Sequence, residues 1–244
     1  MTSGDTLSRR PRPGGGGSAA VTAVVVVTHG GRSVSTEPTT AFQPAVLRMV
    51  PVARAIRRAL HGSAAMVIRP RFQLRGWNGE HASPVEDLRR ILDRLGGQFG
   101  PVPVVLVGHS LGARAALRVA GYPAVTAVAA LAPWLPPGEP VAQLARPPVR
   151  DQQQPALRVL LVHGNADRVT RPDDTWAYAE RARSVAEVAA IEIKDGDHAM
   201  LRRPGLWHDI AAEFTRLALH LPLASTPVAA AISADSADAR RALL

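Results

Sequence analysis

Ser110 is the residue whose surroundings point most clearly to chemistry. It is the centre of Gly-His-Ser-Leu-Gly at 108–112, which follows the apolar run 103–107 and precedes an alanine-rich segment, 111–120, with helical character. A serine on a sharp strand-to-helix turn projects its hydroxyl, and the flanking glycines let the two elements approach closely. The helix also aims its first amides, including that of Leu111, at a reacting carbonyl oxygen. We interpret Ser110 as a nucleophile.

A serine hydroxyl is a poor nucleophile without an adjacent base, and His198 is the histidine best placed to act as one. It lies in Asp-Gly-Asp-His-Ala-Met at 195–200, between the last predicted strand and the last predicted helix. A loop in that position lets an imidazole reach the serine. The other histidines lie before the nucleophile, beside it, at a strand end or near the final helix: His29, His61, His81, His109, His163, His208 and His220.

Asp167 is the candidate for the acid that orients the histidine. It is the first acidic residue after the apolar strand 157–163, and it lies between the serine and the histidine in the chain. An Asx-turn or a helix cap is the alternative role for an aspartate in such a loop. Asp197 is the alternative acid, but a residue adjacent to His198 is poorly placed to bond its ring.

These residues must be positioned by alternating strands and helices. Short apolar runs rich in β-branched residues predict strands at 21–28, 64–69, 103–108, 124–131, 157–163 and 188–194. Helical patterns lie at 44–60, 84–95, 111–120, 173–184 and 205–220. The alternation predicts an α/β fold with a mostly parallel sheet of about six strands and helices on both faces. Catalytic loops in such folds lie at the carboxyl ends of the strands.

Local signals set the limits of some elements. Residues 83–86 form a capping box with proline at the first helical position, and Gly96-Gly97 predicts the end of that helix. Residues 1–18, rich in Gly, Pro, Arg and Ser, predict a flexible leader. Residues 222–244 form an Ala- and Ser-rich tail, which leaves 19–221 as one domain.

The chain order of Ser110, Asp167 and His198 resembles that of the α/β-hydrolases. The motifs that carry the resemblance are HGG at 29–31, GHSLG at 108–112, HGNADRVT at 163–170 and GDHAML at 196–201. The chain looks like a small, lidless serine esterase, or a dienelactone-hydrolase-like member of that superfamily. The resemblance implies a Ser–His–Asp triad that works without a metal or an organic cofactor.

The second oxyanion-hole amide is assigned by this resemblance. In the family, a His-Gly loop after the corresponding strand supplies it, and here that loop is 28–31. The resemblance implies the amide of Gly31, with Arg32 as the alternative. Two backbone N–H groups must face the developing alkoxide, and glycine lets the backbone come close. A tight glycine turn without a catalytic role is the plain alternative, and we expect His29 to brace the loop.

The interval between Ser110 and Asp167 leaves little room for a lid. A helix and two strands fill most of it, and the remainder, 133–155, is proline-rich. We therefore expect an open site without a substantial cap domain, suited to small esters or exposed acyl groups. Trp134 and Trp77 are candidates to line the acyl pocket, although ordinary packing is the alternative for each.

Composition argues against several other classes. The formal net charge is +9, but the arginines are spread along the chain and no basic run is interleaved with aromatic residues, so we expect no nucleic-acid partner. The absence of cysteine excludes disulfides and thiolate metal sites. No apolar stretch reaches the ~20 residues of a transmembrane helix. Arg9, Arg10 and the run 19–27 only loosely imitate a signal peptide, so we expect a cytoplasmic protein.

Together these patterns predict a serine hydrolase that acts on small-molecule esters through an acyl-enzyme intermediate. A thioesterase, a peptidase or an acyltransferase would use the same triad, because loops read the leaving group and the acceptor. A catalytically silent hydrolase fold that serves as a binding module is a further alternative. The sequence leaves the oligomeric state open.

Overall fold

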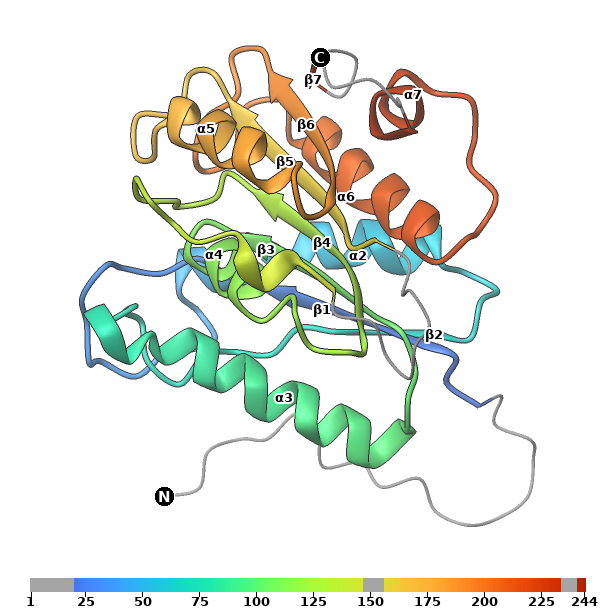
Figure 1. Ribbon diagram of the computed structural model, residues 1–244, viewed down its shortest axis with the longest axis horizontal. Coiled ribbons are helices and arrows are strands. Elements are labelled where there is room, and N and C mark those ends of the chain that lie inside the picture. The colour runs from blue at the N-terminus through green and yellow to red at the C-terminus, as the bar shows by residue number, and fades with distance from the viewer. Residues whose placement is uncertain (1–19, 147–155, 234–240) are drawn as a thin grey trace.

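A computed structural model describes residues 20–146, 156–233 and 241–244, and the expected leader lies outside them. Parallel strands form one sheet in the order β2-β1-β3-β4-β5-β6-β7. The strands are β1 (Ala23–Thr28), β2 (Ala65–Ile68), β3 (Val104–His109), β4 (Val125–Leu131), β5 (Arg158–Gly164), β6 (Glu187–Ile193) and β7 (Arg241–Leu243). The sheet runs through the middle of the molecule (Figure 1). The α/β fold predicted from the sequence is confirmed.

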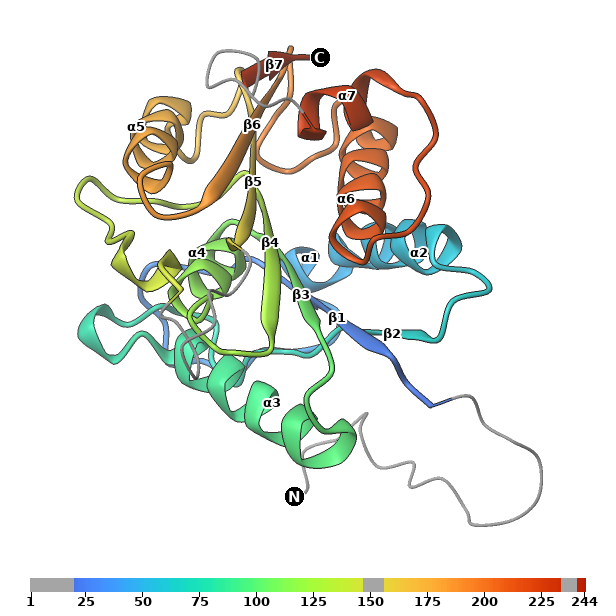
Figure 2. The same cartoon turned by 45° about the vertical axis from the view of Figure 1, so that its right-hand side comes forward.

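Helices cover both faces of the sheet, as Figure 2 shows. One face packs against α3 (Ser83–Phe99), α4 (Leu111–Arg118) and α5 (Pro172–Ala182). The other packs against α2 (Met49–Ala59), α6 (Pro204–Ala218) and α7 (Pro227–Ser233), and the short α1 (Pro44–Leu47) directly precedes α2. Alternate side chains of β1 enter the two cores, Val24 on the α3 side and Val25 on the α2 side. Because every residue of β1 and β3 is buried, both strands read as unbroken apolar runs.

The described sheet has seven strands where the sequence predicted about six. The additional strand is β7, which comes from the segment expected to be a tail and pairs with β6 from Ala190–Arg241 to Glu192–Leu243. Helix α7 also lies in that segment, and its buried Val228 and Ile232 join the core beside α6. Three residues of β7 are too few for a strand periodicity to be detected in the sequence.

Helix α3 begins and ends differently from the prediction. Ser83 already lies inside the helix, its hydroxyl accepts a hydrogen bond from Asn78, and Glu86 pairs with Arg89, so no capping box forms. The helix continues through the two glycines to Phe99 and ends at Gly100, whose φ is 71°. The side-chain partners that Ser83 and Glu86 find elsewhere replace the expected reciprocal cap.

The carboxyl edge of the sheet collects the loops that carry the candidate site. Since all strands are parallel, the loops after β1, β3, β5 and β6 leave the sheet at the same edge. Between β4 and β5 the described residues contain one 3₁₀ turn, η2 (Ala142–Leu144), and no helical cap. A second 3₁₀ turn, η1 (Gly79–His81), precedes α3. Within the described ranges, no helix is long and apolar enough to cross a membrane.

Candidate active site

Ser110 stands on the turn between β3 and α4 in a strained backbone conformation, with φ of 53° and ψ of −117°. The neighbouring glycines are required by packing. A Cβ atom on Gly108 would lie 2.6 Å from the backbone of Ala113, and one on Gly112 would collide with the carbonyl oxygen of His29. The strand and the helix are therefore pressed together, which forces the serine side chain out of the turn.

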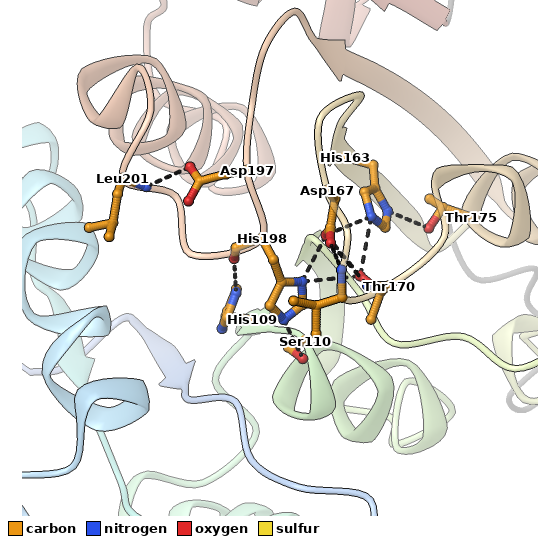
Figure 3. A network of polar contacts seen from close by, with 10 residues as sticks. His109, Ser110, His163, Asp167, Thr170, Thr175, Asp197, His198 and Leu201 are labelled. Carbon is orange, nitrogen blue, oxygen red and sulfur yellow. Dashed lines mark hydrogen bonds and ion pairs between the residues drawn. The ribbon is translucent and has the colours of Figure 1, made fainter.

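Hydrogen bonds join the three residues predicted as a triad in series (Figure 3). His198 Nε2 is 3.1 Å from Ser110 Oγ, and His198 Nδ1 is 2.7 Å from Asp167 Oδ2. The serine follows β3, the aspartate follows β5, and the histidine lies in the loop between β6 and α6. These distances suit proton transfer from the hydroxyl to an imidazole whose other nitrogen is held by a carboxylate.

The acid loop and the histidine loop cross in van der Waals contact. A Cβ atom on Gly164 would collide with the carbonyl oxygen of Gly196, so only glycine permits this approach. The same carbonyl accepts a hydrogen bond from the Ala166 amide at 3.0 Å. The Asp195 amide donates to the side-chain oxygen of Asn165 at 2.8 Å. The crossing fixes the spacing between the acid and the base.

Asp167 accepts hydrogen bonds on both carboxylate oxygens, and its side chain is wholly buried. Oδ1 accepts the amides of Val169 and Thr170 at 2.7 and 2.9 Å. Oδ2 accepts the Thr170 hydroxyl at 2.9 Å and lies 3.0 Å from His163 Nε2, in addition to its bond with His198. Burial by itself would raise the pKa of this carboxyl, but the hydrogen bonds outweigh it and hold the pKa well below its usual range. The residue therefore stays ionised.

His163 and Thr170 support the acid from behind. His163 is fully buried at the end of β5, with Nδ1 2.7 Å from the Thr175 hydroxyl and Nε2 on the carboxylate. His163 thus braces the carboxylate of Asp167. Thr170 was missed by the sequence analysis, although its hydroxyl also lies 3.1 Å from His198 Nδ1. The available signal was an Asp followed three positions later by a threonine, a turn motif in which side chain and backbone bond each other.

His109, the residue before the nucleophile, contacts the loop of the base. Its Nε2 donates to the carbonyl oxygen of His198 at 2.8 Å, and the two rings are 5.0 Å apart. Burial, and then the proximity of His198, lowers the pKa of His109 to about 3, so the ring is neutral at neutral pH. Its side chain holds the backbone of the loop that carries His198.

Asp197, the alternative acid, serves the backbone of its own loop. Its Oδ1 accepts the amides of Leu201 and Arg202 at 2.9 and 2.7 Å. Figure 3 shows this carboxylate on the opposite side of His198 from Asp167. Its position is that of a turn cap, and the ring of His198 is left to Asp167.

The two candidate oxyanion-hole amides in the loop after β1, those of Gly31 and Arg32, differ in whether they are already hydrogen-bonded. The Arg32 amide donates to the carbonyl of Arg75 at 2.8 Å, so it is already used. In the described part of the chain, no hydrogen bond uses the amide of Gly31 or that of Leu111. A Cβ atom on Gly31 would collide with the Arg75 carbonyl and lie 3.1 Å from Leu111 Cδ1. Of the two alternatives left by the sequence, the geometry favours Gly31 over Arg32.

His29 braces this loop, as expected. Its Nδ1 donates to the Gly30 carbonyl at 2.7 Å, and its Nε2 accepts the Phe72 amide at 3.1 Å. The second bond requires an unprotonated Nε2, which fixes the tautomer. Burial lowers the pKa of His29 to about 4, which agrees with a neutral ring.

The two candidate pocket tryptophans lie together around a cation. The guanidinium of Arg114 is 3.9 Å from the ring centroid of Trp77 and 4.6 Å from that of Trp134. The two indoles meet edge to face at 6.1 Å. Trp77 is 4% exposed and packs into the core, whereas Trp134 is partly exposed and its amide donates to the Ser110 carbonyl at 3.3 Å. Trp134 therefore has the better position for ligand contact, and Trp77 supports it.

A buried ion pair ties the loop after β4 to α4. Glu139 has a side chain that is 2% exposed and lies 2.7 Å from Arg114 Nη2, and it also pairs with Arg118. Arg181 of α5 donates to its backbone carbonyl at 2.9 Å. The Arg114–Glu139 pair could not be predicted from the sequence, because the two residues are 25 positions apart and no local pattern links them.

Comparison with known protein families identifies the family to which this chain belongs. The model of the alpha/beta hydrolase family matches residues 24–235, and the chain belongs to that family. Among solved structures, it is similar to the lidless α/β serine hydrolase XC6422 of Xanthomonas campestris, with 21% identity, a TM-score of 0.53, and coverage of 84% of this chain and 85% of that one.

Two further solved structures share the fold. The esterase domain of a Rhodothermus marinus protein has 22% identity and a TM-score of 0.54, with 82% and 88% of the two chains covered. Est1E of Butyrivibrio proteoclasticus has 12% identity and a TM-score of 0.58, with 82% and 89% covered. Comparison with curated proteins gave no match.

Proposed function

We propose that the protein is a serine hydrolase that cleaves carboxylic esters through an acyl-enzyme intermediate. The observation that carries this proposal is the hydrogen-bonded series from Ser110 Oγ through His198 to Asp167, at 3.1 and 2.7 Å, on a strained turn. The family supports hydrolytic chemistry, and structures of similar fold include proteins described as esterases. The lack of a helical cap among the described residues between β4 and β5 supports small esters as substrates.

In the proposed reaction His198 accepts the Ser110 proton while the oxygen attacks the ester carbonyl. The amides of Gly31 and Leu111 stabilise the tetrahedral oxyanion. The ionised Asp167 holds the tautomer of His198 and stabilises the imidazolium that forms. The imidazolium then protonates the leaving alcohol, and water activated by the same base releases the acid and restores the serine. Each proton moved is carried by His198.

Labelling with a serine-directed fluorophosphonate tests the nucleophile. We expect the probe to modify Ser110, to leave the Ser110→Ala variant unlabelled, and to react at least ~10³-fold more slowly with the His198→Ala variant. Ser63→Ala, which removes a hydroxyl remote from the triad, is the matched control and keeps full labelling. An unlabelled folded protein, or reaction at another serine, would refute the assignment and favour a non-catalytic binding module.

A panel of soluble substrates tests the bond that is cleaved. We expect short-chain aryl esters to be hydrolysed faster than thioesters or amides of the same acyl group. A preference for long acyl chains would contradict an open site for small esters. A preference for thioesters or amides, or transfer to an added alcohol in place of water, would reassign the enzyme to a thioesterase, a peptidase or an acyltransferase.

A further inference from the structure

The exposed apolar side chains of the protein gather at one edge. Among the described residues six large apolar side chains are exposed, and five of them lie in the connections after β1, β5 and β6, whereas Leu243 belongs to β7. Val34 and Phe42 follow β1 and are 74% and 85% exposed, Val169 follows β5 at 73%, and Leu201 follows β6 at 72%. The sixth, Leu47, belongs to α1 in the same connection as Phe42. Because the sheet is parallel, these loops leave the edge that carries the triad.

The backbone holds two of these side chains in place on either side of the base. The Val169 amide donates to Asp167 Oδ1 at 2.7 Å, and the Leu201 amide donates to Asp197 Oδ1 at 2.9 Å. In Figure 3, Leu201 lies on one side of His198 and the 167–170 turn on the other. The apolar side chains are therefore fixed beside the opening by the turns that build the site.

Arginines stand beside the apolar residues. Five exposed arginines lie in the same three loops: Arg32, Arg168, Arg171, Arg202 and Arg203. In the described part of the chain none of them is ion-paired with an aspartate or a glutamate, and Arg203 Nη1 donates to the carbonyl oxygen of Leu244 at 2.7 Å. The ion-paired arginines lie mostly on helices or within the sheet. We call these five arginines, with Val34, Phe42, Val169 and Leu201, the rim.

We propose that the rim docks the protein on an anionic lipid surface. Protruding apolar side chains enter the acyl region, and guanidinium groups beside them contact lipid phosphates, a combination that suits the boundary between headgroups and acyl chains. Each arginine near such a surface contributes attraction that salt weakens. The side chains of the rim protrude from three separate loops. A fluid lipid surface can deform around each of them, whereas a folded acidic protein would need a matching pocket for each, so a lipid surface is the better partner. Docking at this edge turns the Ser110 opening toward the lipid.

Sedimentation with lipid vesicles tests the docking separately from catalysis. We expect the full chain to bind vesicles of equal parts phosphatidylcholine and phosphatidylglycerol at least ~10-fold more tightly than vesicles of phosphatidylcholine alone, and high salt to weaken that binding. The Phe42→Ser/Leu201→Ser double variant should bind the mixed vesicles about 10-fold more weakly. Arg168→Gln/Arg202→Gln should do the same.

A matched variant lies outside the rim. Arg94→Gln on α3 removes an exposed arginine elsewhere, and it should leave vesicle binding within about twofold. The rim variants should hydrolyse a soluble ester at the rate of the unmodified protein, which shows that they fold.

The docking proposal is overturned by equal binding to both vesicle types, by rim variants that bind normally, or by an Arg94→Gln variant that loses binding equally. Binding to an acidic polypeptide in preference to the vesicles would assign the rim to a protein partner and also overturn it. Vesicle binding without fluorophosphonate labelling would leave the docking intact and refute the proposed function. Labelling without vesicle binding would do the reverse.

Discussion

Two groups of side chains flank Ser110, and different forces hold them. In the acid–base network, His109, His163, Thr170 and His198 are arranged by hydrogen bonds, most of which converge on the Asp167 carboxylate. In the tryptophan cluster, two indoles stack on Arg114, which pairs with the buried Glu139. Hydrogen bonds fix the direction of a proton donor, whereas stacking and an ion pair fix how the side chains of the tryptophan cluster pack together. Substitutions in the network should therefore cost rate, and substitutions in the cluster should cost stability.

The substitution Asp167→Asn gives the strongest test of whether the acid–base network determines the rate. The amide cannot stabilise an imidazolium, and its N–H groups oppose the N–H of His198, so kcat for a soluble ester should fall about 10⁴-fold with little loss of folding. Steady-state kinetics and the melting temperature measure the two effects. Asp197→Asn is the matched control, since it replaces the aspartate that caps the neighbouring turn, and it should change kcat less than about threefold. Equal losses in the two variants would remove Asp167 from its assigned role.

The cluster is tested by Arg114→Met. Removing a guanidinium that is 10% exposed leaves Glu139 with a weaker set of partners and takes the cation from two indoles, so the free energy of unfolding should fall by about 3 kcal/mol. Urea unfolding measures the loss as a lower midpoint with the slope unchanged.

Arg118→Met provides the comparison for that loss. Arg118 pairs with the same carboxylate, but its side chain is 33% exposed, so its removal should cost only about 1 kcal/mol. The rate of Ser110 labelling should stay within about threefold in both variants, because the triad is untouched. A small change in stability with a large loss of rate for Arg114→Met would show that the cluster positions the nucleophile.

The sequence predicted the parts of the site that topology places and missed those that tertiary contact creates. Ser110, Asp167 and His198 were accessible because each follows or precedes a recognisable strand, and parallel strands send their loops to one edge. The Arg114–Glu139 pair and the bond from His109 to the His198 carbonyl join residues far apart in sequence, with no periodicity to mark them.

Local motifs were less dependable than strand order. The pattern at 83–86 has the residues of a capping box, but Asn78 binds the Ser83 hydroxyl and Arg89 binds Glu86, so tertiary and helical partners compete successfully for both side chains. Gly96 and Gly97 read as a helix end, yet α3 continues past them to Phe99, which packs against the core. Burial of an apolar face outweighs the modest cost of two glycines inside a helix.

The smallest predicted effect is a loss of folding stability at low pH, which separates the acid–base network from the tryptophan cluster. The folded protein keeps His109 neutral down to a pKa of about 3, whereas the unfolded chain protonates it near the ordinary value of 6.5. Unfolding therefore takes up a proton between these values, so stability is unaffected above pH 6.5 and falls as the pH falls, by up to ~1.4 kcal/mol per pH unit from this residue. His29, with a pKa of about 4, adds to the slope until the pH approaches that value.

Urea unfolding between pH 6 and 4.5 should thus show a steep fall of the unfolding free energy with falling pH. The His109→Gln variant should have a smaller slope, because its unfolding takes up about one proton fewer. The glutamine amide can still donate to the His198 carbonyl, so the variant removes the titration while keeping the bond. Arg114→Met is the contrasting variant, because arginine keeps its charge across this range: it should lower stability at every pH without changing the slope. An unchanged slope in His109→Gln would mean that His109 does not couple protonation to folding, and the acid sensitivity would then belong to the loop after β1 through His29.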